Sequence, residues 1–159
     1  IGDPGGAFAR SLLVAAGRAD GIAEGHVALS GEGVAGRVAD VGERAARVML
    51  ITDLNSQIPV SIGLSGERAV MAGDNSAEPR LLYLQPGHHV SAGDRVVTSG
   101  HGGLFPPDLP IGVVAQVTEE AVRVRPYVDW RDLEYLRLVD YELPGLIAPL
   151  IDKQRPSAE

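Results

Sequence analysis

The stretch Val96-Val-Thr-Ser-Gly-His-Gly-Gly-Leu-Phe-Pro-Pro-Asp-Leu-Pro-Ile-Gly112 joins an apolar run to a glycine-rich turn and three prolines. The glycines let the backbone turn at positive φ, whereas the prolines fix φ and remove amide donors. Such a segment cannot join a sheet ladder, so a strand must end where it begins. We expect a stiff loop carrying Leu104 and Phe105, which either closes the end of a barrel or presents apolar surface to a partner.

This loop supplies the candidate partner-binding residues, which are His101, Leu104, Phe105, Pro106 and Pro107. The alternative for Phe105 is a purely structural role as a plug at the end of a barrel. A second group of residues is expected to form turns, because Asp and Asn side chains bond to their own backbone and glycine tolerates positive φ. This structural group consists of Thr52, Asp53, Asn55, Ser56, Gly100, Gly102 and Gly103.

The composition favours short strands over helices. The chain has 159 residues, of which 45% are hydrophobic and only 4% aromatic, and it contains 20 glycines and 11 prolines. Glycine and proline at this density divide a chain into many strands joined by tight turns. We therefore expect an all-β, globular protein with little helix.

Charge and cysteine content exclude several classes of function. The net charge of −7 and the pI near 5.0 repel a phosphate backbone, so no nucleic-acid partner is expected. The chain lacks cysteine and therefore has no disulfide or thiolate metal site. No apolar run reaches the roughly 20 residues that span a bilayer. Because the chain starts at Ile1 and not at methionine, we expect targeting or anchoring segments to lie outside it.

An internal repeat is visible in the sequence. The first copy comprises Ile22-Ala-Glu-Gly25, a β-rich run that ends at Ser30-Gly31, and the strand Gly36-Arg-Val-Ala-Asp-Val41. The second copy comprises Val90-Ser-Ala-Gly93, a run that ends at Ser99-Gly100, and the strand Gly112-Val-Val-Ala-Gln-Val117. The second copy carries the longer insert between its two strands. Two such copies predict two related small barrels.

The repeat sets the expected domain organisation. We expect two small β-barrels of the six-stranded type, able to exchange strands and packed together because a unit of about 70 residues is marginal alone. The first barrel is placed at residues 1–85 and the second at residues 86–143. Residues 144–159 are expected to be a flexible C-terminal tail.

No catalytic or cofactor pattern is convincing. Gly31–Gly36 has the G-x-G-x-x-G spacing, but a strand pattern follows it where a nucleotide site needs a helix. His88, His89 and His101 lack the spacing of metal ligands. Ser99 and His101 lie two residues apart on a glycine turn and cannot form a nucleophile–base pair. We expect no enzymatic activity, metal, cofactor or small-molecule substrate.

Two other kinds of protein remain open as alternatives. Val90-x-x-Gly93-Asp94-x-Val96 resembles the turn of lipoyl-type domains, but the single lysine, Lys153, lies in the tail. This alternative is therefore an unmodified periplasmic adaptor-type β-barrel domain. The second alternative is a degenerate trypsin-like double barrel, because paired barrels are also the outline of those proteases.

Several motifs together resemble the rod shape-determining protein MreC family. The similarity extends from about Ser11 to Tyr141 and is carried by Gly36-Arg-Val, Val48-Met-Leu-Ile-Thr-Asp-Leu-Asn-Ser56, Leu81-Leu-Tyr-Leu84, Gly93-Asp-Arg-Val-Val-Thr-Ser-Gly-His-Gly-Gly-Leu-Phe-Pro-Pro107 and Leu109-Pro-Ile-Gly112.

The resemblance implies a function that composition alone does not give. It implies a non-enzymatic scaffold that maintains rod shape by binding and organising peptidoglycan synthases on the periplasmic side of the bacterial inner membrane. The implied full-length protein has an N-terminal transmembrane helix and a coiled coil, both absent from this sequence. The implied partners are the elongation-specific penicillin-binding transpeptidase, MreD and the associated glycosyltransferase, with self-association into a dimer or filament.

Overall fold

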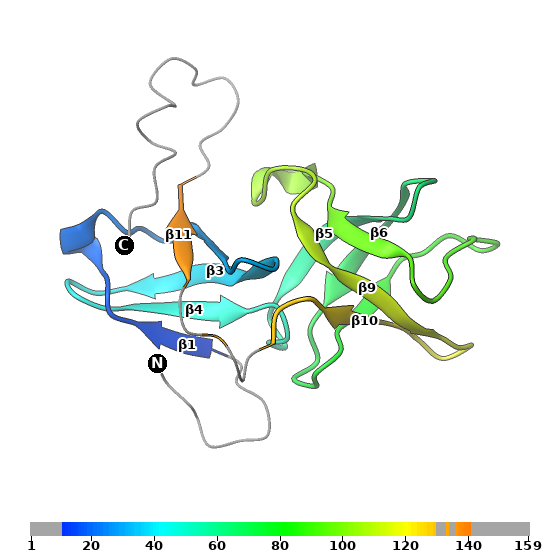
Figure 1. Cartoon of the computed structure of the whole chain (residues 1–159), viewed down its shortest axis with the longest axis horizontal. Helices are drawn as coiled ribbons and strands as arrows, with labels where there is room; N and C mark the ends of the chain where they lie inside the picture. The colour runs from blue at the N-terminus through cyan, green and yellow to red at the C-terminus, as the bar shows by residue number, and fades with distance from the viewer. Residues whose placement is uncertain (1–10, 130–132, 134–135, 141–159) are drawn as a thin grey trace, which may run out of the picture.

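The computed structural model is all-β and describes residues 11–129, 133 and 136–140. Its strands form a five-stranded antiparallel sheet and a closed antiparallel barrel of six strands (Figure 1). The only helical segments in the described part of the chain are two single 3-10 turns, η1 (Arg18–Asp20) and η2 (His101–Gly103). The expected all-β class with little helix is confirmed.

The sheet has the strand order β1-β4-β3-β2-β11. Its strands are β1 (Ser11–Val14), β2 (Val27–Leu29), β3 (Val34–Val41), β4 (Ala46–Leu50) and β11 (Arg137–Val139). The inner face is built largely from small and β-branched side chains such as Ala35 and Val48, both fully buried.

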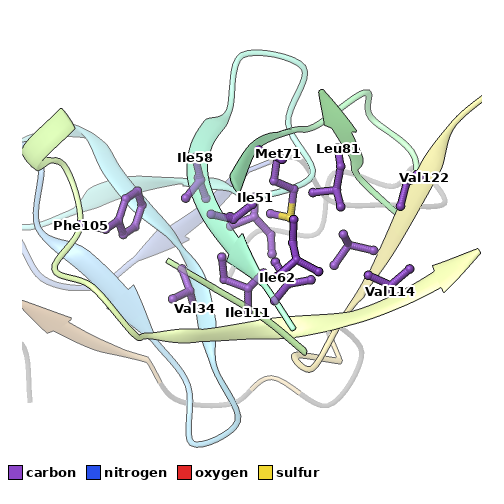
Figure 2. Close-up of a cluster of buried hydrophobic side chains, with 14 of the residues drawn as sticks. Val34, Ile51, Ile58, Ile62, Met71, Leu81, Phe105, Ile111, Val114 and Val122 are labelled. Carbon is purple, nitrogen blue, oxygen red and sulfur yellow. The ribbon is translucent and has the colours of Figure 1, made fainter. Parts of the chain in front are cut away.

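The barrel closes in the order β10-β7-β6-β5-β8-β9. Its strands are β5 (Gln57–Ile62), β6 (Glu67–Ala72), β7 (Arg80–Leu82), β8 (Arg95–Thr98), β9 (Pro110–Val117) and β10 (Val122–Pro126). Alternation along β5 is clean, since Ile58, Val60 and Ile62 are buried and Pro59 and Ser61 face outward with partial exposure. The barrel interior is therefore a packed core of branched aliphatic side chains (Figure 2).

The structure corrects one part of the expected architecture. Among the described residues the first unit is an open five-stranded sheet and not a six-stranded barrel. The barrel is closed by the β5–β8 and β7–β10 pairs, which join β5-β6-β7 to β8-β9-β10, whereas β1 and β11 have no common neighbour in the described part of the sheet. The alternation of apolar and polar residues identifies strands, but it does not show which strands pair with one another. This is why the first unit was wrongly predicted to be a barrel.

Strand pairing also does not follow the expected division near residue 85. Strands on both sides of that position, β7 and β8, belong to the same barrel, and β11 returns from the end of the chain to pair with β2 in the first sheet. The chain passes from sheet to barrel between β4 and β5. The expected tail at 144–159 lies outside the described residues.

The internal repeat is present in the hydrogen bonding of the two units. The strands β2-β3-β4 and β8-β9-β10 have the same order and the same antiparallel directions. Three backbone hydrogen bonds of the first copy have equivalents in the second copy. In the first copy they are Gly25 N–H to Val38 O (2.9 Å), Val38 N–H to His26 O (2.8 Å) and Ile51 N–H to Ala35 O (3.1 Å). Their equivalents in the second copy, in the same order, are Gly93 N–H to Val114 O (2.8 Å), Val114 N–H to Asp94 O (2.8 Å) and Tyr127 N–H to Ile111 O (2.9 Å). The copies differ mainly at the β2–β3 and β8–β9 connections, where the second has the long loop.

Each copy contains an equivalent glycine at a point of close contact between neighbouring strands. A Cβ atom on Gly36 would lie 2.1 Å from the Met49 carbonyl oxygen, and one on Gly112 would lie 2.2 Å from the Arg125 carbonyl oxygen. Gly36 pairs with Leu50 and Gly112 with Pro126, so the two positions are equivalent. Both glycines are needed for neighbouring strands to approach each other.

Gly36→Ala and Gly112→Ala should each destabilise the fold by about 1–3 kcal/mol, because backbone must move to admit the methyl group. Gly31→Ala is the matched control, since a Cβ there meets nothing within 4 Å. Urea unfolding of the three variants measures the difference. Equal stability of Gly36→Ala and Gly31→Ala would contradict the close approach.

Candidate interaction surface

The loop between β8 and β9 is anchored by Thr98, which is fully buried. Its hydroxyl donates to Pro106 O (2.6 Å) and accepts from Leu109 N–H (2.8 Å). Its backbone N–H donates to Leu109 O (2.9 Å), and its carbonyl accepts from Asp108 N–H (2.8 Å). One residue therefore holds the closing end of the loop through four hydrogen bonds.

The sequence interpretation missed Thr98, although a signal was available. Val96 and Thr98 both point into the barrel, because side chains two apart share a face of a strand. A hydroxyl at an inward position must find hydrogen-bond partners. The proline-rich loop supplies them with the Pro106 carbonyl and the Leu109 amide.

The opening turn of the loop uses its glycines as expected. Gly100, Gly102 and Gly103 all have positive φ, at +84°, +79° and +74°. A Cβ on Gly100 would also lie 3.1 Å from the Cβ of Pro107, so glycine is needed there for both reasons. The result is the short η2 turn, which packs against β5 on the outside of the barrel.

The five candidate partner-binding residues divide between the interior and the surface. Phe105 is 5% exposed and belongs to the barrel core, which favours its alternative role as a plug. Figure 2 shows its ring at one end of the buried cluster, and it borders a cavity of about 10 Å³ together with Gly36 and Ile58 at the junction of sheet and barrel. Leu104 is 46% exposed, His101 and Pro107 are also exposed, and Pro106 is half-buried.

Phe105→Ala should cost about 3–5 kcal/mol of folding free energy, because it empties a core position between the two units. Leu104→Ala, one residue away, should change stability by no more than about 0.5 kcal/mol. Denaturant unfolding of both variants gives the comparison. Similar stabilities for the two variants would show that Phe105 does not close the barrel.

A groove of about 680 Å³ runs along the outer wall of the barrel beside η2. Its floor includes Pro59 of β5 and Val70 of β6, which are directly paired across the two strands. Tyr83, just after β7, lies at the groove with 77% of its surface exposed and with φ at +67°. A bulky residue rarely adopts positive φ, so this aromatic ring is held outward on strained backbone.

Two basic side chains from different elements meet in the groove. Arg68 of β6 donates from Nη1 to Nε2 of His101 on η2, an arrangement in which the imidazole acts as acceptor. Neither Arg68 nor Tyr83 was among the candidate binding residues predicted from the sequence. Arg68 and His101 are 33 positions apart, and only the closure of the barrel brings them together.

The residues expected to be structural turns connect the sheet to the barrel. Asp53 Oδ1 accepts from Asn55 N–H (2.7 Å), and Ser56 N–H donates to Asp53 O (2.9 Å). Thr52 is fully buried and its carbonyl accepts from Asn75 N–H (2.8 Å). The turn is thus fastened to the segment that follows β6.

That segment is held on the barrel by Asp74. Its carboxylate accepts from the Ser76 amide (3.1 Å), the Ser76 hydroxyl (2.5 Å) and Arg123 Nη1 (2.6 Å). Burial alone would raise the pKa of Asp74, but the hydrogen bonds from Ser76 and Arg123 outweigh it and leave the pKa below its ordinary value of 3.8. Arg123 Nη1 also donates to Glu78 O (3.0 Å), which ties the same segment to β10.

Because the pKa of Asp74 is lower in the folded state, its stabilising effect is present above pH 3.8 and is lost as the pH falls through the folded pKa. Asp74→Asn should therefore be less stable than the parent chain at neutral pH. The difference should shrink below pH 3.8, as followed by urea unfolding at a series of pH values. A difference that does not change with pH would contradict the role of the carboxylate.

The described residues offer little for catalysis. They contain no cluster of three or more His, Cys, Asp or Glu side chains arranged to hold a metal ion. The Ser99 hydroxyl accepts from the backbone amide of His101 (3.2 Å), which is a turn bond. No helix in the described part of the chain is long and apolar enough to cross a membrane.

Comparison with known proteins identifies the family. A family model described as the rod shape-determining protein MreC, barrel core, matches residues 1–140. The chain belongs to the MreC family. MreC proteins are non-enzymatic cell-shape proteins, in agreement with the absence of a catalytic pattern from the sequence.

Individual relatives agree with the family model. The cell shape-determining protein MreC of Cereibacter sphaeroides is 44% identical over 150 residues, which cover 94% of this chain and 50% of the relative. This chain thus spans about half the length of that relative. A solved MreC structure superposes with a TM-score of 0.82 at 31% identity, covering 88% of this chain and 84% of the other.

Two further solved structures are informative through what they contain. One, described as the major periplasmic domain of the cell shape-determining filament MreC, has a TM-score of 0.70 at 28% identity and covers 82% of this chain and 87% of its own. The other is a complex between penicillin-binding protein PBP2 and MreC from Helicobacter pylori. It has a TM-score of 0.56 at 18% identity, covers 65% of this chain and 68% of that one, and shares the fold.

Proposed function

We propose that this chain is a periplasmic scaffold of the bacterial cell-elongation machinery, anchored at the inner membrane in the full-length protein, which binds and organises peptidoglycan synthases. The principal partner is the elongation-specific penicillin-binding transpeptidase. Family membership and the PBP2 complex of the Helicobacter pylori relative support the choice of partner. The relative described as a periplasmic domain supports the location.

The observation that carries the proposal is the division of roles within one short loop. Thr98 and Phe105 fix the loop to the barrel, and Leu104 is left exposed beside η2. An apolar side chain on rigid backbone loses little conformational entropy when it binds. Leu104 and the neighbouring groove therefore form the proposed docking surface, called here the η2 surface.

Docking at the η2 surface would act on the transpeptidase by population shift. A scaffold favours an active arrangement of its partner only if it binds that arrangement more tightly than the inactive one. MreD and the glycosyltransferase are proposed as further partners of the longer protein. Self-association into a dimer or filament would raise the local concentration of bound synthases.

Leu104→Glu should weaken binding to the periplasmic region of the transpeptidase by about tenfold or more, because it places a charge in a desolvated contact. Titration calorimetry with the purified chain gives the affinity. Leu13→Glu is the control, since Leu13 is 54% exposed but lies on β1 of the sheet. If both variants lose the same affinity for the transpeptidase, or if neither loses any, the contact does not lie at Leu104.

A further inference from the structure

The groove of the η2 surface has a cationic part formed by Arg68 and His101. Arg68 is exposed and forms no ion pair with a carboxylate among the described residues. Four other arginines do so, in the pairs Arg18–Glu43, Arg47–Asp40, Arg123–Asp74 and Arg125–Glu78. Arg68 shares this lack of an ion pair with other described arginines, such as Arg44, but it is the arginine that lines the groove.

The nearest carboxylate in the sequence is directed to a different group. Glu67 precedes Arg68, and its Oε2 accepts from the backbone N–H of His89 (3.3 Å). Arg68 instead donates to the His101 imidazole, which fixes the guanidinium without neutralising its charge. A guanidinium held in place by a neutral acceptor retains donors for an incoming carboxylate.

The rest of the groove combines apolar and aromatic residues with polar ones, among them Glu67 and Gln85. Pro59 and Val70 form a half-buried floor, and the exposed ring of Tyr83 lies at the groove on backbone with positive φ. Proline at position 59 has no amide to donate, so this part of the outer wall favours side-chain contacts. Tyrosine and arginine around an apolar floor are the composition of a protein-binding hot spot.

We propose that the groove binds an extended acidic segment of the transpeptidase, with one carboxylate on Arg68 and a neighbouring apolar side chain over Val70, between Pro59 and Tyr83. This inference rests on the proposed function, because it names the chemistry of the partner segment at the η2 surface. Charge complementarity selects an acidic segment. The Leu104 contact lies on the other side of His101 along the same loop.

The test is titration calorimetry of the whole chain with the periplasmic region of the transpeptidase at low and high salt. Arg68→Glu should weaken binding by about tenfold or more at low salt, because it sets a carboxylate against a carboxylate. Arg68→Gln should reduce the salt dependence of the affinity, since salt screens the charge pair that this variant lacks. Tyr83→Ala should weaken binding while the salt dependence remains.

Arg44→Glu is the matched control, because Arg44 is an exposed arginine in the turn between β3 and β4 of the sheet. It should change the affinity by less than about twofold. Thermal unfolding of every variant shows that the barrel is intact. His101→Gln keeps an acceptor for Arg68 and should bind more tightly than His101→Ala.

The outcomes separate the two proposals. If the parent chain binds and both Arg68→Glu and Tyr83→Ala bind equally well, the groove inference is wrong and the scaffold function stands. If the parent chain does not bind the transpeptidase, both are wrong. Soluble disaccharide-peptide fragments of peptidoglycan also carry carboxylates. If they bind the parent chain but not Arg68→Glu, the groove recognises the cell-wall polymer, and the assignment to a protein segment is wrong.

Discussion

The hydroxyl of Thr98 is the interaction on which the functional end of this protein depends. It lies in the barrel core, where an unpaired polar group would be costly, and it bonds to both the Pro106 carbonyl and the Leu109 amide. Proline in the loop prevents these groups from being satisfied by a ladder of strands. The loop therefore has one well-bonded arrangement, fixed by a residue that is fully buried.

The anchoring of the loop by Thr98 determines both which loop residue packs into the core and which ones are exposed. The same loop sends Phe105 into the junction between barrel and sheet and leaves Leu104 exposed. It also carries His101 across to Arg68 of β6, which sets a cation at the edge of the groove. The buried anchor and the proposed binding surface thus come from adjacent residues of one segment, so a defect in packing is expected to appear as a defect in binding.

Much of the fold could be predicted from the sequence, because strand length and turn chemistry are local properties. The internal repeat predicted from the sequence reappears as matched hydrogen bonds in the two units. Closure of the barrel by the β5–β8 and β7–β10 pairs was not predictable, because it depends on which edges meet after folding. The groove residues Arg68 and Tyr83 were not predicted for the same reason, because they reach the groove only once the barrel has closed. Thr98 could have been predicted, because the alternation along β8 places this polar side chain inside the barrel.

The most direct test of this account is the rate of amide hydrogen exchange in the loop, measured by NMR on the whole chain. Thr98, Asp108 and Leu109 donate the amides that bind the loop to its anchor. The account predicts that these three amides exchange as slowly as Val114 in the middle of β9, while the exposed turn at Gly102 exchanges quickly. Fast exchange at Asp108 and Leu109 alongside a protected Val114 would contradict it, because the loop would then open independently of the barrel.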